Sequence, residues 1–175
     1  MADPLQQALD FLLGLYDNPF VFLPIAFLFA VSVAVVLPIP IELALLRALI
    51  DQRWGYLSAI ALALAVGKTV GAWLIFILGI NLEGKIRLWS ERWRFAALVV
   101  RKAEAFVRKT KYTGLYILLS IPLMSDTIPL YIYSLFNEEG QALRRDMYLI
   151  ANFLAALNRT AFLVVLFFVG VNLFL

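Results

Sequence analysis

Four ionisable residues lie in apolar stretches of the sequence where charge is rarely found: Glu42, Lys68, Asp126 and Arg159. The two carboxylates could carry protons, and the two cations could bind an anion. Each charge at the centre of a bilayer costs about 2.5–3.5 kcal/mol on insertion scales. Because two acids and two bases sum to zero charge, we expect the four residues to pair with one another or to face water.

Two interpretations of these charges differ in function. In the first, they line a polar cavity near the middle of a membrane, where Lys68 and Arg159 bind an anion with help from the positive ends of half-helices. Glu42 and Asp126 would then exchange protons or compensate the cations, because a carboxylate removed from water holds a proton more readily. In the second, the charges form two buried salt bridges, within or across the halves of the chain, that only hold the structure together.

The composition predicts an integral membrane protein. Of the 175 residues, 63% are hydrophobic and 15% are charged, and the mean hydropathy is +0.89. A soluble domain averages roughly 45–50% apolar and about 25% charged residues. A soluble fold of this size could not bury so much apolar surface, so a soluble enzyme, a disordered chain and a secreted disulfide scaffold are excluded.

The residue types that are missing exclude several kinds of chemistry. The chain contains no Cys and no His, so a zinc site of the usual kind, a disulfide, and a Ser or Cys nucleophile with a His base are all excluded. An intramembrane aspartyl protease needs two aspartates in the membrane, and only Asp126 qualifies. We therefore predict that the protein is not an enzyme and uses no metal ion or cofactor. The net charge of +3 does not indicate binding to nucleic acid.

A proline-interrupted segment dominates the first half of the chain. Residues 19–37 form an uncharged apolar run that is long enough to span a bilayer. Pro38 and Pro40 then remove two backbone N–H donors and disfavour a helical conformation just before each ring. The apolar sequence that resumes at 41–50 rises only about 15 Å, roughly half a bilayer. Residues 38–50 are therefore predicted to be one arm of a re-entrant hairpin.

Two further elements flank this hairpin. Residues 2–16 carry leucines at helical spacing with polar residues between them, which predicts a short amphipathic helix at the membrane interface. Residues 56–82 form the clearest predicted spanning helix, with Lys68 near its middle. Gly67 and Gly71 predict a small face on that helix for close packing against another helix.

The second half begins with a basic segment. Residues 83–111 hold nine of the 15 Lys and Arg residues, interleaved with apolar side chains. They predict an amphipathic helix or helix pair on the membrane surface, which faces the cytoplasm by the positive-inside rule. Residues 112–136 are apolar but are broken by Pro122 and Pro129, so they predict a second re-entrant hairpin. Residues 147–175 predict the last spanning helix.

The order of elements therefore occurs twice. The predicted fold is an all-α integral membrane protein, a single domain of residues 1–175 built from two inverted repeats, about 2–82 and about 83–175. Each repeat has an amphipathic helix, a proline-broken re-entrant hairpin and a spanning helix, with a site near the midplane between the two broken segments. The side of the N-terminus stays open. It is cytoplasmic if 19–37 spans fully, and outside if 19–50 is one long hairpin.

Several short motifs combine into a family resemblance. In the first half they are Leu37-Pro-Ile-Pro-Ile-Glu42, Gly55-Tyr56, Gly67-Lys-Thr-Val-Gly71 and Gly79. In the second half they are Lys111-Tyr-Thr-Gly114 and Ser120-Ile-Pro122. Over about 35–174 this pattern resembles the DedA/VTT (SNARE-associated) superfamily, with a Ser-Ile-Pro-Leu stretch that is also similar to the putative small multidrug exporters. The Arg-Phe-x-Pro-x-x-Arg pattern of that superfamily is absent, because residues 119–126 contain no arginine.

The resemblance implies a lipid-handling transporter or scramblase in the cell (plasma) membrane. Members are associated with moving polyprenyl-phosphate carriers or phospholipids between leaflets, in some cases linked to the proton motive force. The partners would be membrane lipids and protons. A homo-oligomer is compatible with the sequence, which does not indicate the oligomeric state.

Three functions stay open at this point. The first is a proton-coupled transporter of lipid-phosphate headgroups, with Lys68 and Arg159 on the phosphate and with Glu42 and Asp126 carrying protons or gating. The second is a proton-coupled exporter of small organic cations that uses the same carboxylates. The third is a membrane scaffold that transports nothing. The hairpin breaks that all three share are assigned to Pro38, Pro40, Pro122 and Pro129.

Overall fold

The computed structural model describes residues 14–36, 42–90, 94–122, 124–137 and 143–174, and the isolated positions 7 and 11. Over this part of the chain it is entirely helical and contains no strand, which confirms the predicted all-α class. The six helices are α2 (Pro19–Val35), α3 (Leu43–Ile50), α4 (Trp54–Ser90), α5 (Arg94–Ser120), α6 (Thr127–Leu135) and α7 (Arg145–Phe174).

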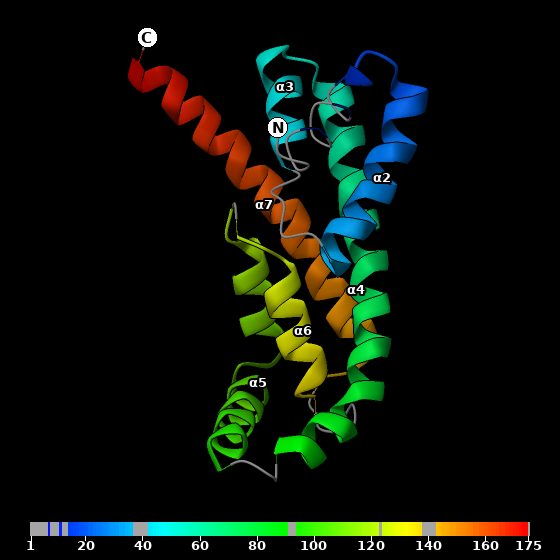
Figure 1. Ribbon diagram of the computed structural model, residues 1–175. Coiled ribbons are helices and arrows are strands. Elements are labelled where there is room, and N and C mark those ends of the chain that lie inside the picture. The colour runs from blue at the N-terminus through cyan, green and yellow to red at the C-terminus, as the bar shows by residue number, and fades with distance from the viewer. Residues whose placement is uncertain are drawn as a thin grey trace.

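Two long helices, α4 and α7, run in opposite directions along the molecule (Figure 1). Each contains a 26-residue segment, Trp54–Gly79 and Arg145–Gly170, that is long and apolar enough to cross a membrane. Only 17% of the most apolar 18-residue stretch of the α7 segment is buried. Its exposed side chains include Phe162 and Val165, an arrangement that suits a lipid environment better than water. The α4 helix continues to Ser90, so the predicted basic segment does not begin at an element boundary.

The first hairpin is formed by α2 and α3, which lie beside the first half of α4 (Figure 1). The Arg47 guanidinium at the end of α3 lies 3.6 Å from the Asp17 carboxylate before α2. At the same end, the Tyr56 hydroxyl donates a hydrogen bond of 2.8 Å to the Tyr16 carbonyl. The chain therefore returns to the end from which it started. The predicted breaks at Pro38 and Pro40 lie outside the described residues.

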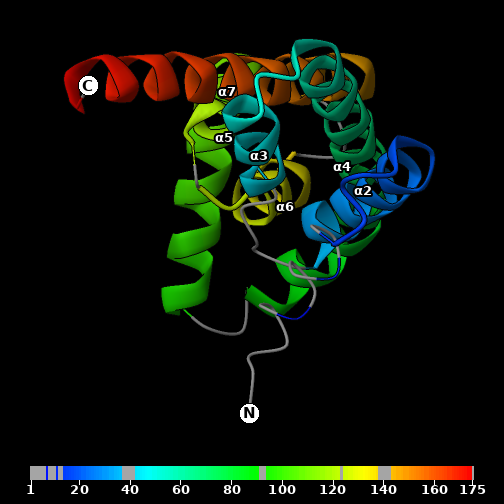
Figure 2. The ribbon, with the colours of Figure 1, turned by 90° about the horizontal axis from the view of Figure 1, so that it is seen from above.

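The second hairpin is formed by the last part of α5 and by α6. A kink at Lys111, with φ 44° and ψ −139°, divides α5 into two helical parts. The kink falls at the boundary that the sequence predicts between the basic segment and the hairpin. Seen from above, the part of α5 before the kink runs across the end of the bundle rather than along it (Figure 2). The remaining residues of α5 rise toward the middle of the molecule, where the turn to α6 follows.

The two prolines predicted to break this hairpin have different places. Pro122 lies in the turn between α5 and α6, as expected. Pro129 instead lies in the first turn of α6, whose first residue is Thr127. The N–H groups of the first helical turn have no intrahelical partner, so a proline there costs the helix nothing. The prediction of a break at Pro129 is therefore wrong.

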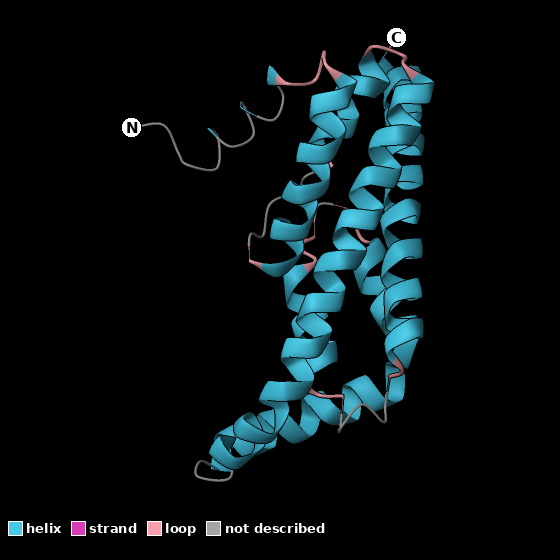
Figure 3. Cartoon of the chain, turned by 90° about the vertical axis from the view of Figure 1, so that its right-hand side faces the viewer, coloured by secondary structure: helices cyan, strands magenta, loops and turns pink. Residues whose placement is uncertain are grey.

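The two hairpins approach the middle of the molecule from opposite ends (Figures 1 and 3). The Thr127 hydroxyl and the Tyr131 hydroxyl of α6 donate to the carbonyls of Val33 and Val35 at the end of α2, at 3.1 and 3.2 Å. The end of α2 and the start of α6 are therefore in contact. The buried apolar side chains form two clusters, and α4 contributes to both: its first part packs with α2 and α3, and its later part packs with α5, α6 and α7.

The glycines of α4 allow the first hairpin to pack closely. A Cβ atom on Gly67 would lie 2.5 Å from the Phe27 carbonyl oxygen, and one on Gly71 would lie 2.5 Å from the Ala34 Cβ. Backbone atoms cannot move aside as a flexible side chain can. These two glycines therefore serve packing between α2 and α4, the close approach that their spacing predicts.

Candidate functional site

The two carboxylates occupy equivalent positions at the starts of the two short helices. Glu42 is the N-cap residue of α3, and Asp126 is the N-cap residue of α6. Neither side chain makes a capping hydrogen bond to its own helix. An N-cap carboxylate ordinarily accepts a bond from the first helical turn. Both side chains instead bind cations of the long helices.

The two cations also occupy equivalent positions. Lys68 lies 14 residues after the first residue of the apolar segment of α4, and Arg159 lies 14 residues after the first residue of the apolar segment of α7. Both segments have 26 residues. Each cation is therefore close to the middle of its helix, where the two hairpins meet.

The four side chains form a closed ring of ion pairs, which we call the four-charge ring. The Lys68 Nζ lies 2.5 Å from Glu42 Oε1 and 2.6 Å from Asp126 Oδ2. The Arg159 Nη1 lies 2.7 Å from Glu42 Oε1, and its Nη2 lies 2.6 Å from Asp126 Oδ1. All four residues are at most 5% exposed. Positive and negative groups alternate around the ring, so its net charge is zero.

The pairing runs both within and across the halves of the chain. Lys68 with Glu42, and Arg159 with Asp126, are pairs within one half. Lys68 with Asp126, and Arg159 with Glu42, cross between the halves. The sequence left both arrangements open, and the structure contains both. Removing one partner of a buried pair leaves an uncompensated charge and typically costs about 3–5 kcal/mol, so each member depends on the others.

Three buried polar groups at the α5–α6 turn belong to the same neighbourhood. The Arg159 Nη2 donates a hydrogen bond of 2.5 Å to the Leu119 carbonyl, in the last turn of α5. Ser120 follows Leu119, and Ser125 precedes Asp126. Within the described residues, the Arg159 Nε and the hydroxyls of Ser120 and Ser125 have no hydrogen-bond partner.

These unpartnered groups mark the turn as a place for a ligand oxygen or a water. An unsatisfied buried donor costs about 1–3 kcal/mol, so native structures rarely keep one without a reason. The sequence did not assign Ser120 or Ser125 to the site, although Ser120 begins the Ser120-Ile-Pro122 motif. The signal that both residues share is their position on either side of Pro122.

Both carboxylates of the ring are paired with cations. Over the part of the chain that the structure describes, no group of three or more Asp or Glu residues could hold a metal ion. Glu42 and Asp126 bind Lys68 and Arg159 instead. The arrangement suits a group that can exchange with one of these ion pairs, namely an anion, a cation or a proton.

Comparison with protein-family models, with curated proteins and with solved structures found no match to this chain.

Proposed function

We propose that this protein spans a cell membrane several times and moves lipid-phosphate headgroups between the leaflets, with the four-charge ring as its site. The observation that carries the proposal is the ring itself, a closed and buried set of two acids and two bases where two hairpins meet. Ionisable side chains inside a membrane most often serve a substrate or proton pathway.

The architecture that fits this function is a pair of inverted repeats with re-entrant hairpins. Three features support it: the N-cap positions of Glu42 and Asp126, the equivalent positions of Lys68 and Arg159, and the opposite directions of α4 and α7 (Figure 1). The hairpins would enter from opposite faces, so the ring could be reached from either leaflet. The basic residues of α5 would place its side of the bundle in the cytoplasm.

The unpartnered groups beside the ring favour an anionic headgroup over an organic cation. A guanidinium N–H can only donate a hydrogen bond, and the Arg159 Nε has no acceptor within the described residues. Phosphate oxygens accept such bonds, and the hydroxyls of Ser120 and Ser125 could donate to the same group. An organic cation could not accept the hydrogen bond that the Arg159 Nε–H offers.

Protons would control whether all four ion pairs of the ring are formed (closed) or one cation is released from its carboxylate (open). A neutral ring has no spare positive charge with which to bind an anion. When Glu42 or Asp126 takes up a proton, the ring acquires a net charge of +1, and one cation is released to bind phosphate. When the proton leaves, the carboxylate displaces the phosphate and the ring closes. Headgroup binding and proton binding would therefore be linked, as in proton-coupled transport.

We also propose that the chain is a divergent relative of the DedA/VTT superfamily. Its main departure from the family pattern is the lack of arginine at 119–126. Arg159 of α7 reaches this same segment, since it donates to the Leu119 carbonyl and binds Asp126. Arg159 would thus supply from α7 the positive charge that the family places in the hairpin.

The test is translocation by the purified protein in vesicles. A fluorescent phosphatidic acid is placed in the inner leaflet, and its arrival outside is followed with a membrane-impermeant quencher under an imposed pH gradient. We expect the protein to accelerate arrival, and Arg159→Gln to abolish the acceleration. The matched control is Arg47→Gln, which removes a half-exposed arginine that pairs with Asp17 and not with the ring. Transport of tetraphenylphosphonium instead would favour the cation exporter, and transport of neither would favour the scaffold.

A further inference from the structure

Helix α7 carries three polar residues at seven-residue intervals, namely Arg145, Asn152 and Arg159. Residues seven apart lie on nearly the same face of a helix and about 10.5 Å apart along it. Arg159 belongs to the four-charge ring. Asn152 is 2% exposed and donates its Nδ2 to the Thr69 Oγ1 of α4 at 3.4 Å. A polar line therefore leads along the α4-facing side of α7, from its first residue to the ring.

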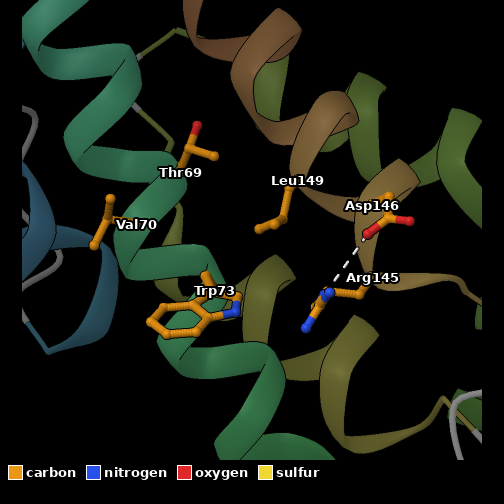
Figure 4. Close-up of a pocket in the computed structure, with 6 residues that line it drawn as sticks. All are labelled: Thr69, Val70, Trp73, Arg145, Asp146 and Leu149. Carbon is orange, nitrogen blue, oxygen red and sulfur yellow. Dashed lines mark ion pairs between the residues drawn. The ribbon is translucent and has the colours of Figure 1, made fainter.

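The outer end of this line opens into a groove between α4 and α7 (Figure 4). The groove has a volume of about 440 Å³. Its lining residues are Thr69, Val70, Trp73, Arg145, Asp146 and Leu149. The Arg145 Nε lies 3.6 Å from the Asp146 Oδ1, and both side chains are more than half exposed. An exposed pair of this kind is weak, so another anion can replace the Asp146 carboxylate as the partner of Arg145.

Chemically, the groove has two parts. Val70, Trp73 and Leu149 provide an apolar surface, and the Arg145 guanidinium provides a positive charge at one edge (Figure 4). An anion joined to a hydrocarbon chain matches both parts. The indole of Trp73 is 40% exposed, and a Trp at the boundary of an apolar region is typical of lipid contact.

Thr69 connects the groove to the ring. It lines the groove, it receives the hydrogen bond from Asn152, and it directly follows Lys68 in the chain. A headgroup bound at Arg145 is therefore separated from the ring by the Asn152–Thr69 contact.

We infer that the groove between α4 and α7 is the lateral entry site for a lipid that carries a phosphate. Arg145 binds the phosphate, and the hydrocarbon chain of the lipid lies along Val70, Trp73 and Leu149. The hydrogen-bonded pair Asn152 and Thr69 lies between the groove and the ring, and the headgroup passes it on the way. The movement of the lipid from the groove to the ring rests on the proposed function. Binding of the lipid in the groove is measured independently of that function.

Binding is measured through the fluorescence of Trp73. The other three tryptophans are replaced by Phe, so that Trp73 emits alone. The protein is placed in phosphatidylcholine nanodiscs that contain a minor fraction of phosphatidic acid with brominated chains, which quench indole on contact. We expect several-fold stronger quenching than with the same fraction of brominated phosphatidylcholine. Equal quenching by the two lipids would overturn the inference, because it would indicate ordinary contact with the bilayer.

Two variants show whether Arg145 is the reason for the preference. Arg145→Gln should abolish it. Arg144→Gln is the matched control, because it removes the same charge from the neighbouring residue, which does not line the groove. A preference that survives Arg145→Gln, or that falls equally in Arg144→Gln, would contradict the site. Competition by inorganic phosphate, at an ionic strength matched with chloride, would contradict a lipid ligand and indicate the free anion.

A last comparison separates this inference from the proposed function. Arg159→Gln should keep the groove preference and lose translocation. Asn152→Leu should also keep the groove preference and slow translocation. Arg145→Gln should raise the lipid concentration at half-maximal rate, with little change in the maximal rate. Normal translocation in Arg145→Gln would show that the groove is not the entry. If the unaltered protein translocates no lipid, the proposed function fails while the quenching result stands.

Discussion

Lys68 and Arg159 share both of their carboxylate partners. Each cation contacts Glu42 before α3 and Asp126 before α6, although the cations come from two helices that run in opposite directions. Each long helix is thus tied to both hairpins. The four-charge ring therefore couples the hairpins to each other. A change in one ion pair alters the contacts of α3, α4, α6 and α7.

The first prediction concerns the loss of one negative charge. In Glu42→Gln the amide keeps the size of the side chain, but two cations then share one carboxylate. We expect translocation to be abolished and the folded protein to persist, destabilised by about 3 kcal/mol. Translocation and thermal unfolding in detergent are measured on the same preparation. Asp17→Asn is the control, because the Asp17 carboxylate is 79% exposed and pairs with Arg47 at the surface. Near-normal translocation by Glu42→Gln would refute the role of this carboxylate.

The second prediction distinguishes a ring from two isolated pairs. Exchanging Glu42 and Lys68, as Glu42→Lys with Lys68→Glu, would preserve an isolated pair. In the ring it places the new Lys beside Arg159 and the new Glu beside Asp126. Like charges in contact repel, so the double variant should remain well below the unaltered protein in stability. The midpoints of thermal unfolding of the two proteins decide this, and recovery of the unaltered midpoint in the double variant would argue for independent pairs and for the scaffold.

The third prediction concerns geometry at constant charge. Arg159 binds Glu42, Asp126 and the Leu119 carbonyl at once through its planar guanidinium. Arg159→Lys keeps the positive charge but replaces the guanidinium with a compact ammonium that cannot make all three contacts. We expect a destabilisation of about 1–3 kcal/mol and slower translocation. Arg144→Lys, at an exposed position, should change neither. An Arg159→Lys protein with unchanged stability would mean that charge alone matters at this position.

The fourth prediction concerns the packing of α2 on α4. Gly67→Ala places a Cβ against the Phe27 carbonyl and the Ala30 side chain, and overpacking of this kind typically costs about 1–3 kcal/mol. The control is Gly170→Ala in α7, where a Cβ would meet nothing within 4 Å. Alanine is the better helix former, so the control should be neutral or slightly stabilising. Thermal unfolding of the two variants compares the effects, and equal midpoints would show that α2 does not pack here as described.

The fifth prediction concerns orientation in the membrane. The chain has no Cys, so each introduced Cys can be labelled alone. Asp51→Cys, in the turn between α3 and α4, should react with an impermeant maleimide from outside the cell. Lys109→Cys, in the part of α5 before the kink, should react only after the membrane is opened. Labelling of both from the same side would contradict the proposed orientation of the hairpins.

Much of the helical organisation follows from the sequence. The apolar runs near 56–82 and 147–175 predict two spanning helices, and the structure has candidate spans at Trp54–Gly79 and Arg145–Gly170. A run of this length and hydropathy has few alternatives to a helix, so its existence is a local property. The local sequence does not determine the role of Pro129, because proline is tolerated both in a turn between helices and in the first turn of a helix.

What the sequence by itself determined is the class of the protein and the identity of its four anomalous charges. Their presence in apolar segments requires compensation, whatever the fold, because isolated charges there are too costly. Only the tertiary structure decided how they pair, since the partners are 26 to 117 residues apart in the chain. It also decided that the hydroxyls of Ser120 and Ser125 are buried at the α5–α6 turn without a hydrogen-bond partner among the described residues, and that Asn152 and Arg145 lie on the side of α7 that faces α4. Contacts between distant segments depend on how the helices cross, and no local pattern specifies that.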